Sequence, residues 1–153
     1  MQLQIDLSDD VFDDSIKAIA EKLRQMVIDG KIVGNYGEKI SIKNSHRNLC
    51  VVADKSTGKV YFGLSSNNPN NPTLRSTIND WLANRMKVVK QTKTYPLDNC
   101  AEFKAINAAL QDKADIKNLV SYTVWTDRGE FHAPCSQCQD MYKGFIGSFL
   151  DWE

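Results

Sequence analysis

The chain has 153 residues, of which 42% are hydrophobic and 25% are charged, and its formal net charge is zero. This length and composition predict one domain, residues 1–153, that encloses its own hydrophobic core. No apolar stretch approaches the roughly 20 residues of a membrane-spanning helix, which excludes a membrane protein of that type. A zero net charge also excludes a strongly basic protein, so any binding of nucleic acid must depend on a local surface.

The N-terminal segment, residues 1–6, lacks the basic and apolar regions of a signal peptide, so we do not expect this chain to export itself by that route. A helix is predicted next. It starts near residues 8–10, where acidic side chains favour the positive end of the helix dipole, and it stops at Gly30. Its apolar residues recur at helical spacing and should lie on a sheet; they are Phe12, Ile16, Ile19, Leu23 and Val27.

Two strands joined by a turn are predicted in the centre of the chain. Segments 49–53 and 59–63 are rich in β-branched and aromatic residues, and the residues between them have the composition of a hairpin turn. The polar connection 35–44 has room for a short strand at 39–42. The clearest loop of the chain is 65–72, because asparagine, serine and proline dominate it.

The second half of the chain predicts three helices and one strand. The helices span 73–89, 99–111 and a segment from Pro134 to Gly144 or Gly147, and the strand spans 119–126. The first helix carries Leu74, Ile78, Trp81 and Leu82 on one side, and the second is expected to bury Ala101, Ala105, Ile106, Ala109 and Leu110. The inner face of the last helix is expected to hold Cys138, Met141, Tyr142 and Phe145. This order of elements predicts an α/β domain with helices on both faces of a small sheet.

Two short motifs carry the chemistry of the chain. Cys135 and Cys138 lie three residues apart in a first helical turn, so their sulfur atoms can point the same way, and Cys100 stands at the start of another helix. Helix N-termini favour thiolate over thiol. Three protein ligands leave the fourth position of zinc for water, and Glu102 is suited to act as general acid and base rather than as a ligand. The two motifs together predict a catalytic zinc site.

Three other interpretations compete with catalytic zinc. All four cysteines could hold a structural zinc, but Cys50 lies in an apolar strand, where a lone cysteine is usually a small buried side chain. A redox pair of Cys135 and Cys138 would leave Cys100 and Glu102 unexplained, and the triplet Cys-Ala-Glu alone could arise by chance. Disulfides are less expected, because a domain of this size does not need them and the clustered spacing is typical of metal binding.

These motifs resemble the cytidine deaminase superfamily. Residues 95–102 with Ala105 and Ile106 resemble the first zinc helix of free cytidine deaminases, and 134–141 with Phe145 resembles the second. The hairpin end 58–63 is also similar, so the resemblance covers roughly residues 47–66 and 94–149. It implies a three-layer α/β/α fold. It also implies that Cys100, Cys135 and Cys138 bind Zn²⁺ while Glu102 moves protons between water, the ring nitrogen and the departing ammonia.

The chain departs from free cytidine deaminases at three places. Ser65-Ser66-Asn67 stands where they carry an Asn-x-Glu element that holds the ribose, and an extra segment, 67–94, precedes the first zinc helix. Phe103 stands where the three-cysteine type has an arginine that offsets the thiolate charge, which leaves the helix N-termini or Lys104 for that task. The loss of the ribose contact argues against a small nucleoside as substrate.

The extra segment carries a basic run that opposes a single acidic residue, Asp80. Such a run is either a solvated helix face or a surface that binds phosphates. Trp81 in the same segment fits packing in the core or a role beside the substrate. The cations that could contact a nucleic-acid backbone are Arg75, Arg85, Lys87, Lys90 and Lys93.

At these positions the chain is more similar to the deaminase domains of bacterial polymorphic toxins, including the YwqJ-like group. That resemblance implies deamination of cytosine to uracil in nucleic acid, with unpaired DNA favoured because the target base must leave any stack. It also implies action in the cytoplasm, delivery as the C-terminal part of a secreted protein, and an immunity protein as partner. A free nucleoside deaminase and a non-catalytic module with structural zinc stay open. The candidate substrate contacts are Ser66, Asn67, Ala101, His132 and Pro134, although His132 also fits a solvated loop.

Overall fold

The computed structural model describes residues 3–7, 12–29, 48–65, 78–93, 97 and 100–152, and every structural statement below concerns these residues. They form a five-stranded mixed sheet and four helices. The strands are β1 (Leu3–Gln4), β2 (Asn48–Asp54), β3 (Lys59–Leu64), β4 (Leu119–Trp125) and β5 (Ser148–Phe149). The helices are α1 (Phe12–Ile28), α3 (Asp80–Val88), α4 (Ala101–Gln111) and α5 (Ser136–Tyr142).

The sheet has the strand order β1-β3-β2-β4-β5. β2 pairs antiparallel with both β3 and β4, so Val51 lies between Phe62 and Tyr122, and β5 adds to β4 in the parallel direction. The β2–β3 turn needs Gly58, because its φ is +77° and a Cβ there would collide with the carbonyl of Ile5. β2 and β4 are inner strands of the sheet, so their side chains face the helices on both of its sides.

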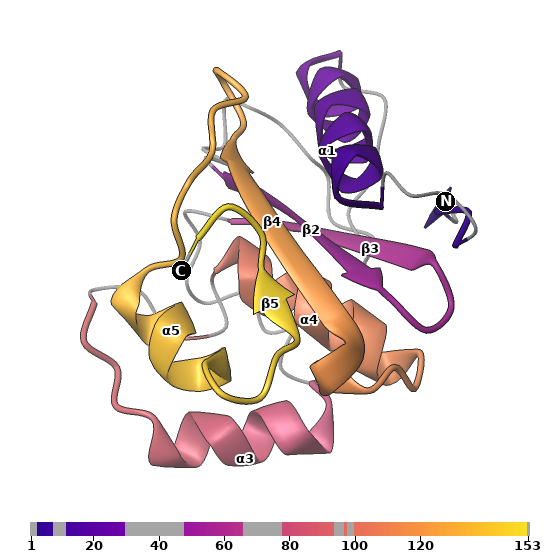
Figure 1. Cartoon of the computed structure of the whole chain (residues 1–153). Coiled ribbons are helices and arrows are strands. Elements are labelled where there is room, and N and C mark those ends of the chain that lie inside the picture. The colour runs from indigo at the N-terminus through magenta and orange to yellow at the C-terminus, as the bar shows by residue number, and fades with distance from the viewer. Residues whose placement is uncertain are drawn as a thin grey trace.

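The helices cover the two faces of the sheet in separate layers. α1 lies on one face, where it buries Ile16, Leu23 and Val27 against the odd-numbered residues of β2, whereas α4 and its neighbours lie on the other (Figure 1). Successive side chains of a strand point to opposite faces, so Val51 belongs to the α1 side and Val52 to the α4 side. The structure therefore confirms the three-layer α/β/α fold. None of the described helices is both long and apolar enough to cross a membrane.

Most predicted elements are present, and several predictions are wrong in detail. The sequence did not indicate the two-residue strands β1 and β5 at the sheet edges. Phe145 was expected on the inner face of the last helix, but α5 already ends at Tyr142 and Phe145 is 41% exposed. The chain leaves helical geometry at Lys143 and continues through Gly144 at a φ of +88°, which takes Phe145 out of the helical register. Leu110 is only partly buried. The predicted strand at 39–42 and the segment 66–77 lie outside the described residues. The predicted helix 73–89 is wrong at Ile78 and Asn79, because α3 begins only at Asp80, with Asn79 as its N-cap.

Candidate metal centre and active site

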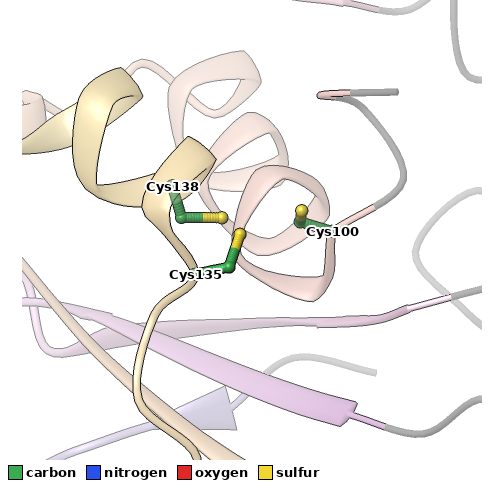
Figure 2. A group of neighbouring side chains, drawn as sticks. All are labelled: Cys100, Cys135 and Cys138. Atoms are coloured by element: carbon green, nitrogen blue, oxygen red, sulfur yellow. The ribbon is translucent and has the colours of Figure 1, made fainter. Parts of the chain in front are cut away.

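Three cysteines from two helices meet on the α4 side of the sheet. The sulfur atoms of Cys100, Cys135 and Cys138 all lie within 4.8 Å of one another. Figure 2 shows their side chains converging from the beginnings of α4 and α5. Cys100 and Cys138 are buried and Cys135 is half-buried. The cluster predicted from the two sequence motifs is therefore present, and it could hold a metal ion.

The helix starts explain why these sulfurs converge. Cys100 is the N-cap of α4 and Cys135 the N-cap of α5, yet neither side chain forms a capping hydrogen bond. Their sulfur atoms are thus not used to satisfy the first N–H groups of their helices, a task that N-cap side chains usually perform. Cys138 follows one turn into α5, on the same side as Cys135. This arrangement leaves all three sulfurs directed at one point.

The thiols of the cysteine cluster need a bound cation in order to ionise together. The pKa of Cys100 is raised, first by its contact with Cys135 and then by burial, and the pKa of Cys138 is raised by its contacts with Cys100 and Cys135 and by burial. Three neighbouring sulfurs, two of them buried, cannot all ionise unless a positive ion compensates them. Sulfur ligands in this number suit zinc, and they leave one coordination position open.

Cys50 does not belong to this cluster. It is fully buried in β2, its sulfur lies 3.2 Å from the hydroxyl oxygen of Ser121, and burial raises its pKa to about 12. An inert thiol in an apolar strand is the usual state of a structural cysteine. The arrangement therefore does not support a structural zinc held by all four cysteines.

Glu102 is the acidic group beside the three sulfurs. Its carboxyl is only 4% exposed, and its Oε2 accepts a hydrogen bond from the Cys138 thiol at 3.1 Å. Its pKa is raised by burial, an effect that contacts with Cys138 and Thr123 partly oppose, and the nearby His132 also lowers it. A buried carboxyl with a raised pKa is the kind of group that acid–base catalysis uses.

Thr123 positions this carboxyl, and sequence reasoning missed it. Its hydroxyl donates to Oε1 of Glu102 at 2.9 Å from the neighbouring strand β4. A signal was available, because Ser121 and Thr123 are polar and alternate with valine and tyrosine along an otherwise apolar strand. Polar residues with a period of two indicate a strand face directed at something other than apolar core.

The predicted substrate contacts have different outcomes. Ala101 and Pro134 are buried next to Cys100 and Cys135, and His132 is half-buried with its ring 4.4 Å from that of Trp125. Ser66, Asn67 and Arg75 lie outside the described residues. The substrate-contact roles of Ser66, Asn67, Ala101, His132 and Pro134 stay predictions. Phe103, which stands where the resembled family has an arginine, and Lys104, the cation expected to offset the thiolate charge instead, are both buried on α4.

The described part of the basic run divides into two kinds of cation. Arg85 donates to the carbonyl oxygens of Asp140 and Met141 at 2.7 and 3.2 Å and lies 4.8 Å above the ring of Phe145. It therefore fastens α3 to the end of α5. Lys87, Lys90 and Lys93 are exposed, and none has an acidic partner among the residues that the structure describes.

A buried glutamine attaches this basic segment to the metal-binding helix. Gln137, which is fully buried between Cys135 and Cys138, accepts hydrogen bonds from the backbone N–H groups of Thr92 and Lys93 at 2.8 and 3.0 Å. The hydroxyl of Ser136 lies 3.5 Å from that of Thr92. The segment that carries Lys90 and Lys93 is thus held against the first turn of α5, beside the cysteine cluster.

Comparisons with known proteins identified no relative of this chain. No protein-family model, no curated protein and no solved structure matches the chain. The function of the chain must therefore be inferred from the geometry of the site itself.

Proposed function

We propose that this chain is a zinc-dependent hydrolase that deaminates cytosine to uracil in nucleic acid, with single-stranded DNA as the favoured substrate. One observation carries the proposal: a buried carboxyl, Glu102, lies 3.1 Å from one of three cysteine sulfurs that converge on a common point. A structural metal site has no need of an ionisable group held beside its ligands. A hydrolytic site needs that group to move protons.

The three cysteines fit zinc by donor type and number. Zinc held by Cys100, Cys135 and Cys138 would keep a fourth position for water and lower the pKa of that water toward neutrality. The positive ion would also favour the thiolate forms of Cys100 and Cys138, whose pKa values are raised by contacts with the other cluster thiols and by burial.

Glu102 would carry the protons of the reaction. Deamination joins a water oxygen to C4 of cytosine and breaks the bond from C4 to the exocyclic nitrogen, so that cytosine and water become uracil and ammonia. The ionised carboxylate accepts a proton from the water, delivers it to the ring nitrogen, and a further proton transfer lets the amine leave as ammonia. Thr123 holds one oxygen of Glu102 at 2.9 Å, which leaves the other oxygen on the side of the sulfurs.

The choice of a polymer over a nucleoside is supported by the surface beside the cluster. Lys87, Lys90 and Lys93 lie on and after α3, and Gln137 attaches this segment to the helix that carries two of the three cysteines. Exposed lysines without acidic partners are suited to a phosphate backbone, and they contribute a salt-dependent part of the affinity. Delivery as a toxin domain follows from the resemblance alone and is part of the proposal on that ground.

The proposal is tested by expressing the chain in cells that cannot excise uracil from DNA and then sequencing their genome and transcripts. We expect C-to-T changes in DNA with the wild-type chain and none with Glu102→Gln, which keeps the size of the side chain but cannot accept a proton. Edits confined to transcripts would identify RNA as the substrate. Deamination of free cytidine by the purified chain, without edits in either polymer, would favour the nucleoside deaminase instead.

A further inference from the structure

A row of polar and aromatic side chains extends from Glu102 toward the end of the sheet. Thr123 contacts Glu102, and Trp125, two residues further along β4, lies on the same face because side chains alternate along a strand. Asn48 of β2 is directly opposite Trp125 and shares that face. The three residues continue the surface on which the reaction is proposed to take place.

His132 joins the same row from the segment that leads to Cys135. Its backbone N–H donates to the carbonyl oxygen of Thr123 at 2.8 Å, and the residue before it, Phe131, stacks on Tyr122 at 6.0 Å on the α1 side. The next side chain must therefore point to the opposite face, where its ring meets that of Trp125 edge to face at 4.4 Å. We call Asn48, Thr123, Trp125 and His132 the Trp125 row.

Two atoms of this row are buried without a hydrogen-bond partner. They are Oδ1 of Asn48 and Nδ1 of His132, and no residue in the described part of the chain supplies a partner for either. Native proteins rarely leave buried polar atoms unsatisfied, since each costs free energy that a ligand or water can recover. Both residues are only half-buried as a whole, so a ligand can approach them.

Helix α1 holds the turn that follows Trp125 in place. Arg24 donates to the carbonyl oxygens of Thr126 and Asp127 at 3.2 and 3.4 Å, and Glu21 holds the guanidinium of Arg24 through two contacts of 2.8 Å. Gly129 must be glycine, because its φ is +73° and a Cβ would come within 2.8 Å of Arg24. The turn after β4 is consequently fixed before any ligand arrives, which lowers the entropy lost on binding.

A cation lies at the outer end of the row. The guanidinium of Arg128 is 4.6 Å from the centre of the Trp125 ring, and its side chain is half-exposed. Its ionic contact is Glu130 at 3.4 Å, an exposed pair of small energy that a phosphate can replace. An indole with a guanidinium on it can present both an aromatic surface and a positive charge to a nucleotide.

We infer that the Trp125 row binds the target nucleotide, with Asn48 and His132 as hydrogen-bonding partners of its sugar or base and Arg128 as the partner of its phosphate. The inference rests on the proposed function and deepens it, because it specifies a phosphate-bearing nucleotide rather than a free nucleoside. Residues from β2, β4 and the turn after β4 would then take the place of the Asn-x-Glu element that holds the ribose in free cytidine deaminases.

Binding without turnover tests the inference most clearly. Zinc-loaded Glu102→Gln protein, with Trp81→Phe and Trp152→Phe so that Trp125 is the only indole, is titrated with a single-cytosine DNA oligonucleotide, cytidine 5′-monophosphate and cytidine. Quenching of fluorescence reports contact at Trp125, and calorimetry gives the affinity. We expect Asn48→Ala and His132→Phe each to weaken oligonucleotide binding by roughly 3- to 10-fold, the effect of about one hydrogen bond.

Stability and charge controls separate a binding role from a structural one. Neither variant removes a side-chain hydrogen bond to another residue that the structure describes, so melting temperatures should stay equal or rise slightly. Arg128→Gln should weaken binding of the oligonucleotide and of the monophosphate but not of cytidine. Lys117→Gln, another exposed acid-paired cation at the opposite end of β4, should change none of these affinities.

The outcomes distinguish this inference from the proposed function. If the oligonucleotide binds and all variants bind it equally, the Trp125 row is not the nucleotide site, while deamination stands. An unchanged monophosphate affinity in Arg128→Gln overturns the phosphate contact specifically. If the wild-type chain neither deaminates nor binds any of the three ligands, the proposed function fails and the inference fails with it.

Discussion

The two faces of the sheet bury different chemistry. The α1 side is an apolar core of aliphatic and aromatic side chains such as Ile16, Leu23 and Val51. Seven of the eight buried polar or charged residues in the described part of the chain lie on the other side instead: Asp54, Glu102, Lys104, Asn107, Ser121, Thr123 and Gln137. The three clustered cysteines lie there too.

This asymmetry separates stability from chemistry. Burial of a polar group costs free energy unless it finds a partner, so a fold selected only for stability would not concentrate such groups in one layer. The α1 layer supplies apolar burial that can compensate that cost. Substitutions on the α1 face should therefore lower the stability of the fold, whereas substitutions on the other face should impair zinc binding or activity.

The largest effect is expected from removal of a sulfur ligand. Replacement of Cys100, Cys135 or Cys138 by serine should abolish stoichiometric zinc binding, whereas Cys50→Ala should keep one zinc per chain. Zinc at about 1,000 times its dissociation constant should stabilise the wild-type fold by about 4 kcal/mol and the ligand variants much less. Metal analysis and thermal unfolding with and without zinc check both. A requirement for all four cysteines would restore the structural zinc site.

A core substitution on the α1 face should show the opposite pattern. Leu23 is completely buried there, so Leu23→Ala should destabilise the fold by about 2–5 kcal/mol. The folded fraction should still bind one zinc with unchanged affinity, because no metal ligand lies in that layer. Urea unfolding and zinc titration measure the two quantities, with the exposed Lys22→Ala on the same helix as control. Loss of zinc affinity in folded Leu23→Ala would break the separation of the two faces.

The exposed lysines should affect polymer binding alone. Simultaneous replacement of Lys87, Lys90 and Lys93 by glutamine should lower the slope of log affinity against log salt by about 2 for a single-stranded oligonucleotide. Zinc content and the affinity for free cytidine should not change. The matched control replaces three exposed lysines elsewhere, Lys22, Lys55 and Lys117. An equal loss of affinity in both triple variants would indicate only a general charge effect.

The smallest effect concerns the contact that links α1 to the turn after β4. Hydrogen bonds from Arg24 lower the pKa of Glu21 to about 2 from an ordinary value of 4.5. The folded state therefore favours ionised Glu21. Its contribution to stability is complete above about pH 4.5 and is lost as the pH falls toward 2. Since the Glu21 side chain is 53% exposed, the contribution should be at most about 1 kcal/mol.

Comparing the unfolding free energies of wild-type and Glu21→Gln protein across this range isolates the contact. The difference should be present at pH 7 and disappear between about pH 4.5 and 2. A difference that persists unchanged at pH 2 would show that Glu21 stabilises the helix by packing instead.

Periodicity and capping were sufficient to predict the main elements and the metal cluster. The apolar spacing of Phe12 to Val27 predicted α1, and β-branched residues predicted β2 and β4. The cysteine cluster could be predicted because both motifs begin helices, and the start of a helix fixes the direction of its first side chains.

The rest depended on contacts that no local pattern specifies. β1 and β5 have two residues each, too few for a periodic signal, and they form only because a neighbouring strand offers unpaired backbone groups. Thr123 and Asn48 acquire their positions from strand register, which the sequence does not fix by itself. Phe145 was misplaced because the predicted helix was extended beyond Tyr142, where the backbone turns.

One measurement tests the central claim most directly: the time course of uracil formation in a single-cytosine DNA oligonucleotide incubated with the purified, zinc-loaded chain. Uracil should accumulate with the wild-type protein, fall by roughly 10²- to 10⁴-fold with Glu102→Gln at unchanged zinc content, and stop when zinc is removed by a chelator. Stoichiometric zinc in a folded protein that leaves cytosine intact in DNA, RNA and free cytidine would contradict the account.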